Sequence, residues 1–373
     1  MVAILEKRSL RDFDWLVAIL AVAIVSFGVW QIYNAQPTES YWSKQIIGLG
    51  IAITAMLVVS FTDYRRIVDA APFFYGLGLF LLVIVLIPGI GMKINGQQCW
   101  IKVPLIGQFQ PSEFVKVPVI LMLAKYFGSR KDEVLKLKEV SVGVLILAVP
   151  IFLIMLEPDL GQSITYFPIL AVVFFLSAVK IRYVIASMIL IAVMLPVGYW
   201  VGVQTGKLKG YKKERIDVIV DPESADPRGF AYHTIQSMIT VGKGGLSGIK
   251  GDTETSQSVL KFLPAPQTDF IFAVAAENTG FIGCVSLLLA YALLLSRLVS
   301  GARQAPDRAG MLVIMAIVGE LAFQIFMNVG MTLGILPVIG VPLPLMSAGL
   351  SAVLATFIAI GFVISVKMRR FVN

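Results

Sequence analysis

The feature that most constrains this chain is a series of apolar runs, most of them close to 20 residues long. About 20 apolar residues in a helix cross the ~30 Å hydrocarbon core of a bilayer. Backbone groups in lipid must be hydrogen-bonded within the protein, which favours helices, and no alternating ten-residue segments typical of a β-barrel are present. Only 14% of the residues are charged, against roughly 25% in soluble domains. The sequence predicts an all-α, polytopic membrane protein.

We predict ten spans within a single membrane domain of residues 1–373. The fourth and fifth are short, and the eighth is long enough to tilt or protrude. The predicted spans are 15–33, 45–61, 72–90, 112–127, 140–156, 162–179, 183–202, 269–296, 309–334 and 348–366.

The distribution of basic residues sets the orientation of these spans, because cytoplasmic loops are rich in Lys and Arg. With a cytoplasmic N-terminus, the short outer loops hold only Lys44, Lys93 and Lys102, and most other basic residues outside the large loop fall inside. Both termini are then cytoplasmic. The net charge of +8 is explained by this asymmetry and requires no nucleic-acid partner.

One long segment, residues 203–268 between spans seven and eight, is a large extracytoplasmic loop by parity. Loops longer than about 15 residues are usually functional or disordered. The stretch Phe230–Val241 has the pattern of an amphipathic helix, and Gly242–Gly248 indicates a turn. We expect the loop to be partly ordered and to lie on the outer membrane surface.

Few residue types are available for catalysis or metal binding. His233 is the single histidine, and the two cysteines, Cys99 and Cys284, are far apart in the sequence. A histidine-based catalytic triad, a multi-histidine metal site and a disulfide framework are therefore excluded or improbable.

Ionisable side chains near the outer ends of spans are the main functional candidates, because charge in a membrane segment is costly. Glu113 and Lys116 are three residues apart and can pair on one helix face. Asp269 opens span eight, and Glu277 lies about two turns further on roughly the same side.

Each candidate also has a structural interpretation. Glu113 and Lys116 can be an ion pair that joins helices, and Glu157 and Asp159 can cap span six. Asp269 can be a first-turn residue with Thr268 as the cap. Glu277 can be a satisfied core carboxylate, and Trp100 an interfacial anchor. The residues alone leave these alternatives open.

Five motifs in order carry a family resemblance: "NGQQCWI", "GQFQPSEFVKV", "EPDLG", "FLPAPQTDFIFAVAAENTGFIG" and "NVGMTLGILPVIGVPLPLMS". The chain resembles the SEDS family (shape, elongation, division and sporulation) over nearly its whole length. The last motif and the short N-terminus make it most similar to the elongation branch, the RodA-type members. The resemblance implies a peptidoglycan glycosyltransferase of the bacterial plasma membrane that polymerises lipid II at the outer face. It also implies a class B penicillin-binding protein, the crosslinking transpeptidase, as partner.

The chain departs from the family pattern near these motifs. Ala265 and Gln267 replace an acid and a histidine before "TDF", Cys99 replaces an arginine before Trp100, and "SAGLSA" begins at Ser347 where the family has "SYGGSS". Asp269 is retained. We expect the following residues to bind substrate or support the site: Trp100, Glu113, Lys116, Glu157, Asp159, Thr268, Lys243 and Ser347.

The implied reaction inverts a sugar carbon and needs a base on the attacking face. We expect Asp269 to deprotonate the acceptor hydroxyl, with its pKa raised by partial burial. Lys116, Lys243 or Arg215 could offset the charge of the departing lipid diphosphate. A Mg²⁺ or Mn²⁺ bridging the diphosphate and a carboxylate is the alternative. No organic cofactor is expected, and the lipid tails are expected in grooves between helices.

Two other functions compete with this one. A lipid II flippase would also need buried charge, but transporters tend to place their sites near the midplane between repeats, whereas these acids gather at one face. A non-catalytic member that only activates a penicillin-binding protein is the second alternative.

Overall fold

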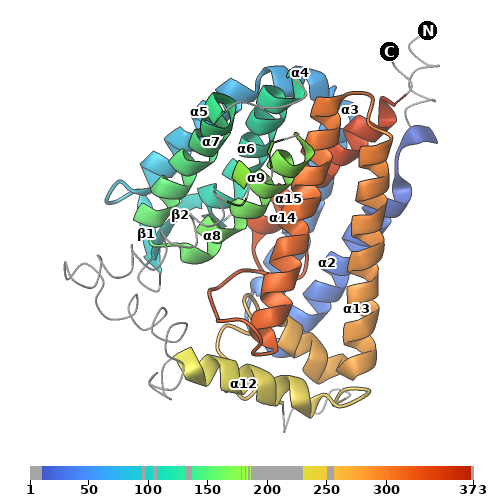
Figure 1. Ribbon diagram of the computed structural model, residues 1–373. Coiled ribbons are helices and arrows are strands. Elements are labelled where there is room, and N and C mark those ends of the chain that lie inside the picture. Colours follow the sequence, from blue (N-terminus) through green and yellow to red (C-terminus); the bar gives the residue numbers. More distant parts are fainter. Residues whose placement is uncertain are drawn as a thin grey trace.

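The computed structural model describes residues 11–94, 97–103, 107–130, 137–177, 179, 180, 182, 183, 185, 230–249 and 256–370. Within these residues the chain is a bundle of helices (Figure 1). Six helices are long and apolar enough to cross a membrane: α2 (Trp15–Ala35), α3 (Tyr41–Phe61), α7 (Leu137–Leu156), α13 (Ile271–Arg303), α14 (Arg308–Thr332) and α15 (Leu350–Met368). The predicted class, an all-α multi-pass membrane protein, is confirmed.

The other predicted spans differ in detail. Span three corresponds to α5 (Ala71–Val85), which follows the short α4 (Tyr64–Asp69), and span four is α6 (Pro111–Gly128). Span six is divided into α8 (Leu160–Thr165) and α9 (Phe167–Leu176). The proline in the first turn of α9 lacks the N–H that would continue α8. Span seven lies almost entirely outside the described residues, so the count of ten remains a prediction.

Helix α6 lies at the centre of the half of the bundle that contains α5, α7 and α9, and it also packs on α14 and α15. Helix α15 packs along α3, and α13 packs on both α2 and α14. The start of α2 and the end of α15 lie at one end of the bundle, while α12 (Phe230–Lys243) lies across the opposite end (Figure 1). This arrangement places the predicted cytoplasmic and outer segments at opposite ends of the protein.

A small antiparallel sheet was not predicted from the sequence. It has the order β1 (Gly91–Ile94), β2 (Gln97–Val103) and β3 (Gly107–Phe109), and it fills the connection between α5 and α6. The strands are only three to seven residues long, so their alternation is weak beside the flanking apolar runs.

The predicted amphipathic helix in the large loop is confirmed as α12. Its polar Ser237 is buried and donates a hydrogen bond to the carbonyl of Thr332, at 2.8 Å. Ile235, Met238 and Ile239 are exposed instead. A helix that turns its apolar residues away from the protein is suited to an apolar surrounding such as the membrane interface.

Helix α13 is bent at Gly280, where the segment after α12 meets it. Gly280 has a φ of +65°, and a Cβ there would lie 2.5 Å from the backbone nitrogen of Gly248. The amide of Phe281 donates to the carbonyl of Gly245 at 2.9 Å. The segment predicted as a turn, 242–248, thus packs with its backbone directly against the backbone of α13 at Gly280. The bend at Gly280 changes the direction of the first turns of α13.

Candidate active site

Asp269 lies in a turn whose backbone carbonyls accept hydrogen bonds from α14 and from the loop before α15. The side-chain amide of Asn328 in α14 donates to the carbonyl of Asp269 at 2.9 Å. The hydroxyl of Ser347 donates to the carbonyl of Thr268 at 2.6 Å, and the amide of Ala348 donates to the carbonyl of Gln267 at 2.8 Å. Asp269 is itself half-buried. These contacts fix the backbone that carries the Asp269 side chain at the entrance to α13.

The first-turn interpretation of Asp269 is wrong. Helix α13 begins at Ile271, after Asp269, and its N-cap residue is Phe270, which has no side-chain cap. The Thr268 hydroxyl lies 3.5 Å from the carbonyl of Ala265 and does not cap the helix. Asp269 is therefore not held in place by a role in helix capping. Ser347, a predicted support residue, contacts the same turn.

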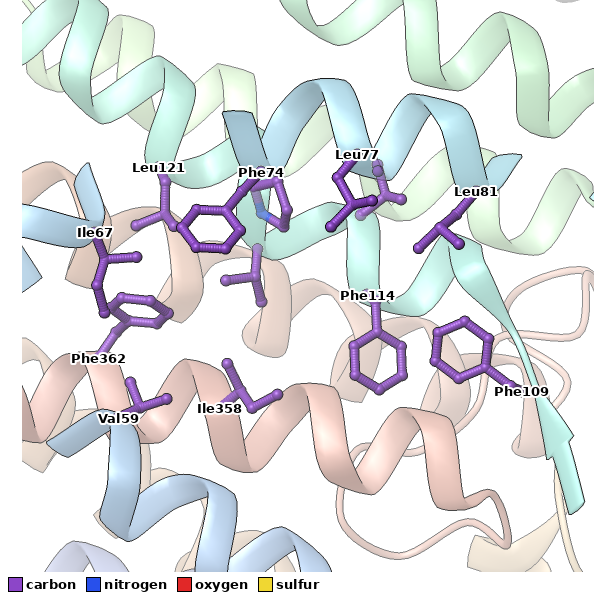
Figure 2. Close-up of a pocket in the computed structure, with 14 residues that line it drawn as sticks. Val59, Ile67, Phe74, Leu77, Leu81, Phe109, Phe114, Leu121, Ile358 and Phe362 are labelled. Atoms are coloured by element: carbon purple, nitrogen blue, oxygen red, sulfur yellow. The ribbon is translucent and has the colours of Figure 1, made fainter. Parts of the chain in front are cut away.

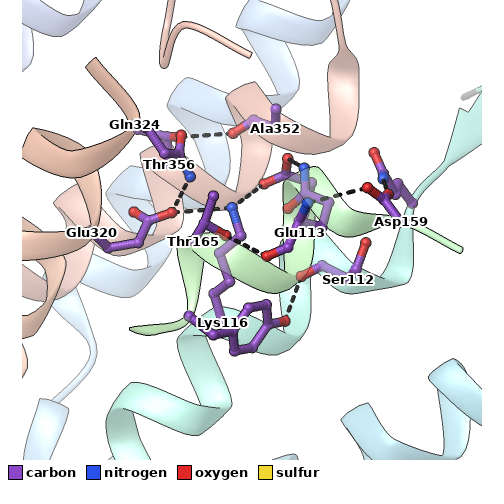
Figure 3. Close-up of polar contacts among 12 residues, drawn as sticks. Ser112, Glu113, Lys116, Asp159, Thr165, Glu320, Gln324, Ala352 and Thr356 are labelled. Atoms are coloured by element: carbon purple, nitrogen blue, oxygen red, sulfur yellow. Dashed lines mark hydrogen bonds and ion pairs between the residues drawn. The ribbon is translucent and has the colours of Figure 1, made fainter. Parts of the chain in front are cut away.

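A second cluster of buried polar residues lies around Lys116 (Figure 3). The predicted pair is confirmed, because the Lys116 ammonium is 2.8 Å from a Glu113 carboxylate oxygen. The same ammonium lies 3.0 Å from Glu320 in α14. All three side chains are buried, with exposed fractions of 4–7%. One cation is thus shared by two carboxylates from two helices.

Amide side chains complete this cluster. Gln162 in α8 donates to Glu113 at 2.5 Å, and Gln324 donates to Glu320. Glu320, Gln162 and Gln324 were not among the residues predicted from the sequence. Glu320 carried a usable signal, since it is an ionisable residue within predicted span nine. The two glutamines carried none, because uncharged polar residues are common in helix interfaces.

The "EPDLG" motif lies beside this cluster. Its two acids, Glu157 and Asp159, have different roles. Asp159 caps α8, accepting from the amide of Gln162 at 3.1 Å, and it also accepts from the side chain of Gln110 at 2.9 Å. Gln110 directly precedes α6. The capping interpretation is therefore confirmed for Asp159, which also joins α8 to the start of α6.

Glu157 does not cap a helix. It lies in the turn after α7 and is fully buried. Among the described residues, neither of its carboxylate oxygens has a hydrogen-bond partner. Burial, with the negative charge of Asp159 beside it, raises the pKa of Glu157 to about 9. The group therefore holds its proton at neutral pH.

We predict that Glu157 gives stability a characteristic pH dependence. Its pKa is higher in the folded state than in the unfolded chain, so the folded state binds more protons between about pH 4.3 and about 9. Stability then falls as pH rises, by ~1.4 kcal/mol per unit for one proton. Glu157→Gln removes this slope. The difference in melting temperature between variant and wild type should grow in the variant's favour from pH 6 to pH 8. A constant difference would contradict the prediction.

The small sheet covers the same turn. The side chain of Gln97 in β2 donates to the carbonyl of Pro158 at 3.1 Å. Cys99 is buried, and burial together with the charges of Asp159 and Glu157 raises the pKa of its thiol. The next residue, Trp100, is half-buried and lies opposite Met92 in the strand pair. Whether Trp100 anchors the interface or contacts substrate remains a prediction.

Glu277 is a buried carboxylate whose oxygens are hydrogen-bonded within the protein, which confirms the structural interpretation given for it above. It is fully buried. It accepts hydrogen bonds from the hydroxyls of Ser256 and Ser258, at 3.0 and 2.8 Å, and from the amides of Gln257 and Ser258, at 2.6 and 3.3 Å. Glu277 therefore fastens the segment that leads to Asp269 and is not free to meet a substrate.

We predict that Glu277→Gln loosens this segment. An amide has one acceptor oxygen in place of two, and its NH₂ group would face donors. Leaving such buried donors unpaired costs about 1–3 kcal/mol. The variant should show a lower melting temperature and faster hydrogen exchange at residues 256–268. Asp69→Asn, at an exposed carboxylate in α4, is the matched control and should leave both unchanged. Unaltered exchange in Glu277→Gln would contradict the role.

The remaining candidates lie elsewhere. Lys243 is in the last turn of α12, and Arg215 lies outside the described residues. Within the part of the chain that the structure describes, no three His, Cys, Asp or Glu side chains gather as a metal site.

The loop between α14 and α15 brings the two clusters together. Ser347 in this loop contacts the Asp269 turn. A Cβ on Gly161 of α8 would lie 2.6 Å from the carbonyl of Gly340, so the "EPDLG" turn packs against the same loop. Asn328 joins it from α14, donating to Val341 at 2.8 Å as well as to Asp269. Motifs far apart in the sequence thus meet at one end of the bundle.

Comparison with known proteins identifies the family. A family model described as a cell cycle protein, FtsW/RodA/SpoVE, matches residues 11–371. The chain is 34% identical to the peptidoglycan glycosyltransferase MrdB of Escherichia coli K12 over 369 residues, which covers 98% of this chain and 97% of MrdB.

Solved structures agree with this assignment. One similar chain comes from work on the structural coordination of polymerization and crosslinking by a peptidoglycan synthase complex. The TM-score is 0.80 with 32% identity, covering 97% of this chain and 99% of that one. Thermus thermophilus RodA, a rod shape determining protein, gives a TM-score of 0.72 with 28% identity over 97% of this chain and 98% of its own. The chain belongs to the FtsW/RodA/SpoVE family, the SEDS family that its motifs indicated.

Proposed function

We propose that this chain is a peptidoglycan glycosyltransferase that polymerises lipid II at the outer face of the bacterial plasma membrane, with both termini in the cytoplasm. The observation that carries the proposal is the half-buried Asp269 in a fixed turn, at the end of the bundle away from the start of α2 and the end of α15. MrdB, which the chain matches over almost its full length, has the same named activity.

Asp269 is the proposed base. The acceptor sugar hydroxyl of one lipid II attacks the lipid-linked carbon of the other chain, and the bond from that carbon to the diphosphate breaks. Asp269 accepts the hydroxyl proton as the new glycosidic bond forms. The hydrogen bonds from Asn328 and Ser347 fix the backbone of this turn before substrate arrives, which supports the preorganisation that catalysis requires.

Lys116 was considered above as a cation for the lipid diphosphate, and we now propose a structural role for it. Lys116 is buried and already shared by Glu113 and Glu320, so its charge is neutralised within the protein. We propose that Lys116 holds α6 and α14 together, and that Lys243 is the residue that contacts the diphosphate. A divalent cation has no three-ligand site in the described residues. The polymerisation test below compares Mg²⁺, Mn²⁺ and EDTA, so that it measures the dependence on a divalent cation.

An apolar groove supports a lipid-linked substrate. A cavity of about 320 Å³ lies between α3, α5, α6 and α15, and its lining is entirely apolar (Figure 2). Phe109 and Phe114 line one part of it. These residues flank the start of α6, whose Glu113 belongs to the buried cluster. We propose that this groove accepts a prenyl tail while the headgroup reaches the polar end of the bundle.

The proposed partner is a class B penicillin-binding protein. A similar solved chain belongs to a peptidoglycan synthase complex, which supports an assembly of polymerase and crosslinking enzyme. We propose that the two proteins act together in cell elongation: this chain polymerises the glycan strands and the partner crosslinks them.

The test is polymerisation by the purified full chain. The protein, alone and with its partner, is given lipid II with Mg²⁺, Mn²⁺ or EDTA, and glycan chains are resolved on a gel. Polymer that depends on the chain supports the proposal. Lipid II that crosses vesicles faster when the chain is present, with no polymer formed, would favour a flippase. Polymer made only by the partner would leave the chain as an activator.

A further inference from the structure

A second cavity, of about 460 Å³, lies beside the Asp269 turn and has no part in the mechanism above. One wall is the connection between α2 and α3, residues 35–39. The other is residues 258–266, which lead directly to Asp269. Unlike the apolar groove, its lining includes charged and polar residues beside apolar residues and prolines.

The wall next to Asp269 is held in a strained form. Lys261 and Ala265 both line the cavity, and both have positive φ angles, +61° and +43°. Such angles are unfavourable for residues with a Cβ and persist where the surroundings fix them, often at binding sites. Here Glu277 fixes one end of the wall through Ser258, and Ser347 fixes the other through Thr268.

The cavity is close to the proposed base. Pro266 lines it, and Asp269 is three residues further along the chain. Three residues span at most about 11 Å even when fully extended. A group bound in this cavity can therefore belong to the same molecule whose sugar meets Asp269.

The charges of the cavity are of both signs. Lys261 stands on one wall and Glu39 on the other, and both are exposed. Within the described residues, neither side chain takes part in an ion pair. A ligand that carries both a carboxylate and an amine would match this pair, whereas a neutral saccharide would leave both charges unused.

We propose that this cavity binds the peptide carried by the lipid-linked disaccharide, with Lys261 contacting a peptide carboxylate and Glu39 a peptide amine. The inference rests on the proposed function and adds a peptide specificity to it. The peptide is attached to the muramyl sugar, so its position next to the reacting sugar agrees with a cavity next to Asp269. Lys261 and Glu39 are specificity residues and take no part in bond formation.

The experiment compares two substrates for the purified full chain. One is lipid-linked disaccharide with its pentapeptide, and the other is the same lipid with the peptide removed and the lactyl group amidated. We expect Lys261→Gln and Glu39→Gln each to lower kcat/KM for the first substrate about threefold to tenfold, and to leave the second unchanged. Lys261→Arg should retain the preference. Lys93→Gln, at an exposed lysine of β1, is the matched control and should change neither value.

Several results would overturn the proposal. If Lys261→Gln and Glu39→Gln lowered kcat/KM equally for both substrates, the cavity would not bind the peptide. If kcat/KM were unchanged for both substrates, the cavity would have no part in substrate binding. A loss seen only when the penicillin-binding protein is present would assign the cavity to that partner.

A wild type that makes no polymer from either substrate would instead reject the proposed function. In that case, binding of the soluble disaccharide pentapeptide, measured by calorimetry, still decides the inference. Wild type should bind it more tightly than Lys261→Gln, and equal or undetectable binding would reject the cavity as a peptide site.

Discussion

Asp269→Asn is expected to lower the rate of lipid II polymerisation by about 10²–10⁴-fold, the usual contribution of a positioned general base. Asparagine has nearly the same shape but cannot accept the proton. The hydrogen bonds from the Asn328 and Ser347 side chains end on backbone carbonyls of this turn, which the substitution retains, so we expect the variant to fold, and its melting temperature checks this. Rates of glycan formation at saturating lipid II measure the effect.

The control for this variant is Asp69→Asn. Asp69 is exposed at the end of α4, and its backbone carbonyl, which the substitution retains, accepts a hydrogen bond from Lys125. Its amide variant should polymerise at the wild-type rate. If Asp269→Asn retained more than about a tenth of the activity, the assignment of the base would be wrong, because that loss is below the range expected for general base catalysis.

Lys116→Met is expected to destabilise the protein by about 3–5 kcal/mol, because it leaves two buried carboxylates without their shared cation. Glu113 lies 2.8 Å and Glu320 3.0 Å from the ammonium. Glu320→Gln should be milder, since the pair of Glu113 and Lys116 then remains. Thermal unfolding in detergent, followed by intrinsic fluorescence, measures both.

A triple variant separates the structural role of Lys116 from a chemical one. Lys116→Met combined with Glu113→Gln and Glu320→Gln removes every charge of the cluster, so most of the lost stability should return. If Lys116 only holds α6 and α14 together, activity should recover with stability. Recovered stability without activity would show that the Lys116 charge acts on the substrate, contrary to our assignment.

Local spacing predicted some of this site. Glu113 and Lys116 are three residues apart on one helix, and their pairing followed from helix geometry alone and is confirmed. The capping role of Asp159 was likewise a local signal. In contrast, the spacing of Asp269 and Glu277 suggested one shared face. The structure instead starts α13 after Asp269 and turns Glu277 into the protein to hold residues 256–258.

The sequence by itself determined the membrane class, the position of most helices and the family, because hydropathy over about 20 residues and ordered motifs are properties of the chain alone. Only the tertiary structure decided that Glu320 shares Lys116, that Ser347 fixes the Asp269 turn and that a charged cavity lies beside it. The contact of Ser347 with Thr268 joins residues 79 positions apart in the chain, and that of Lys116 with Glu320 joins residues 204 positions apart. Their formation depends on how helices pack, which no local pattern encodes.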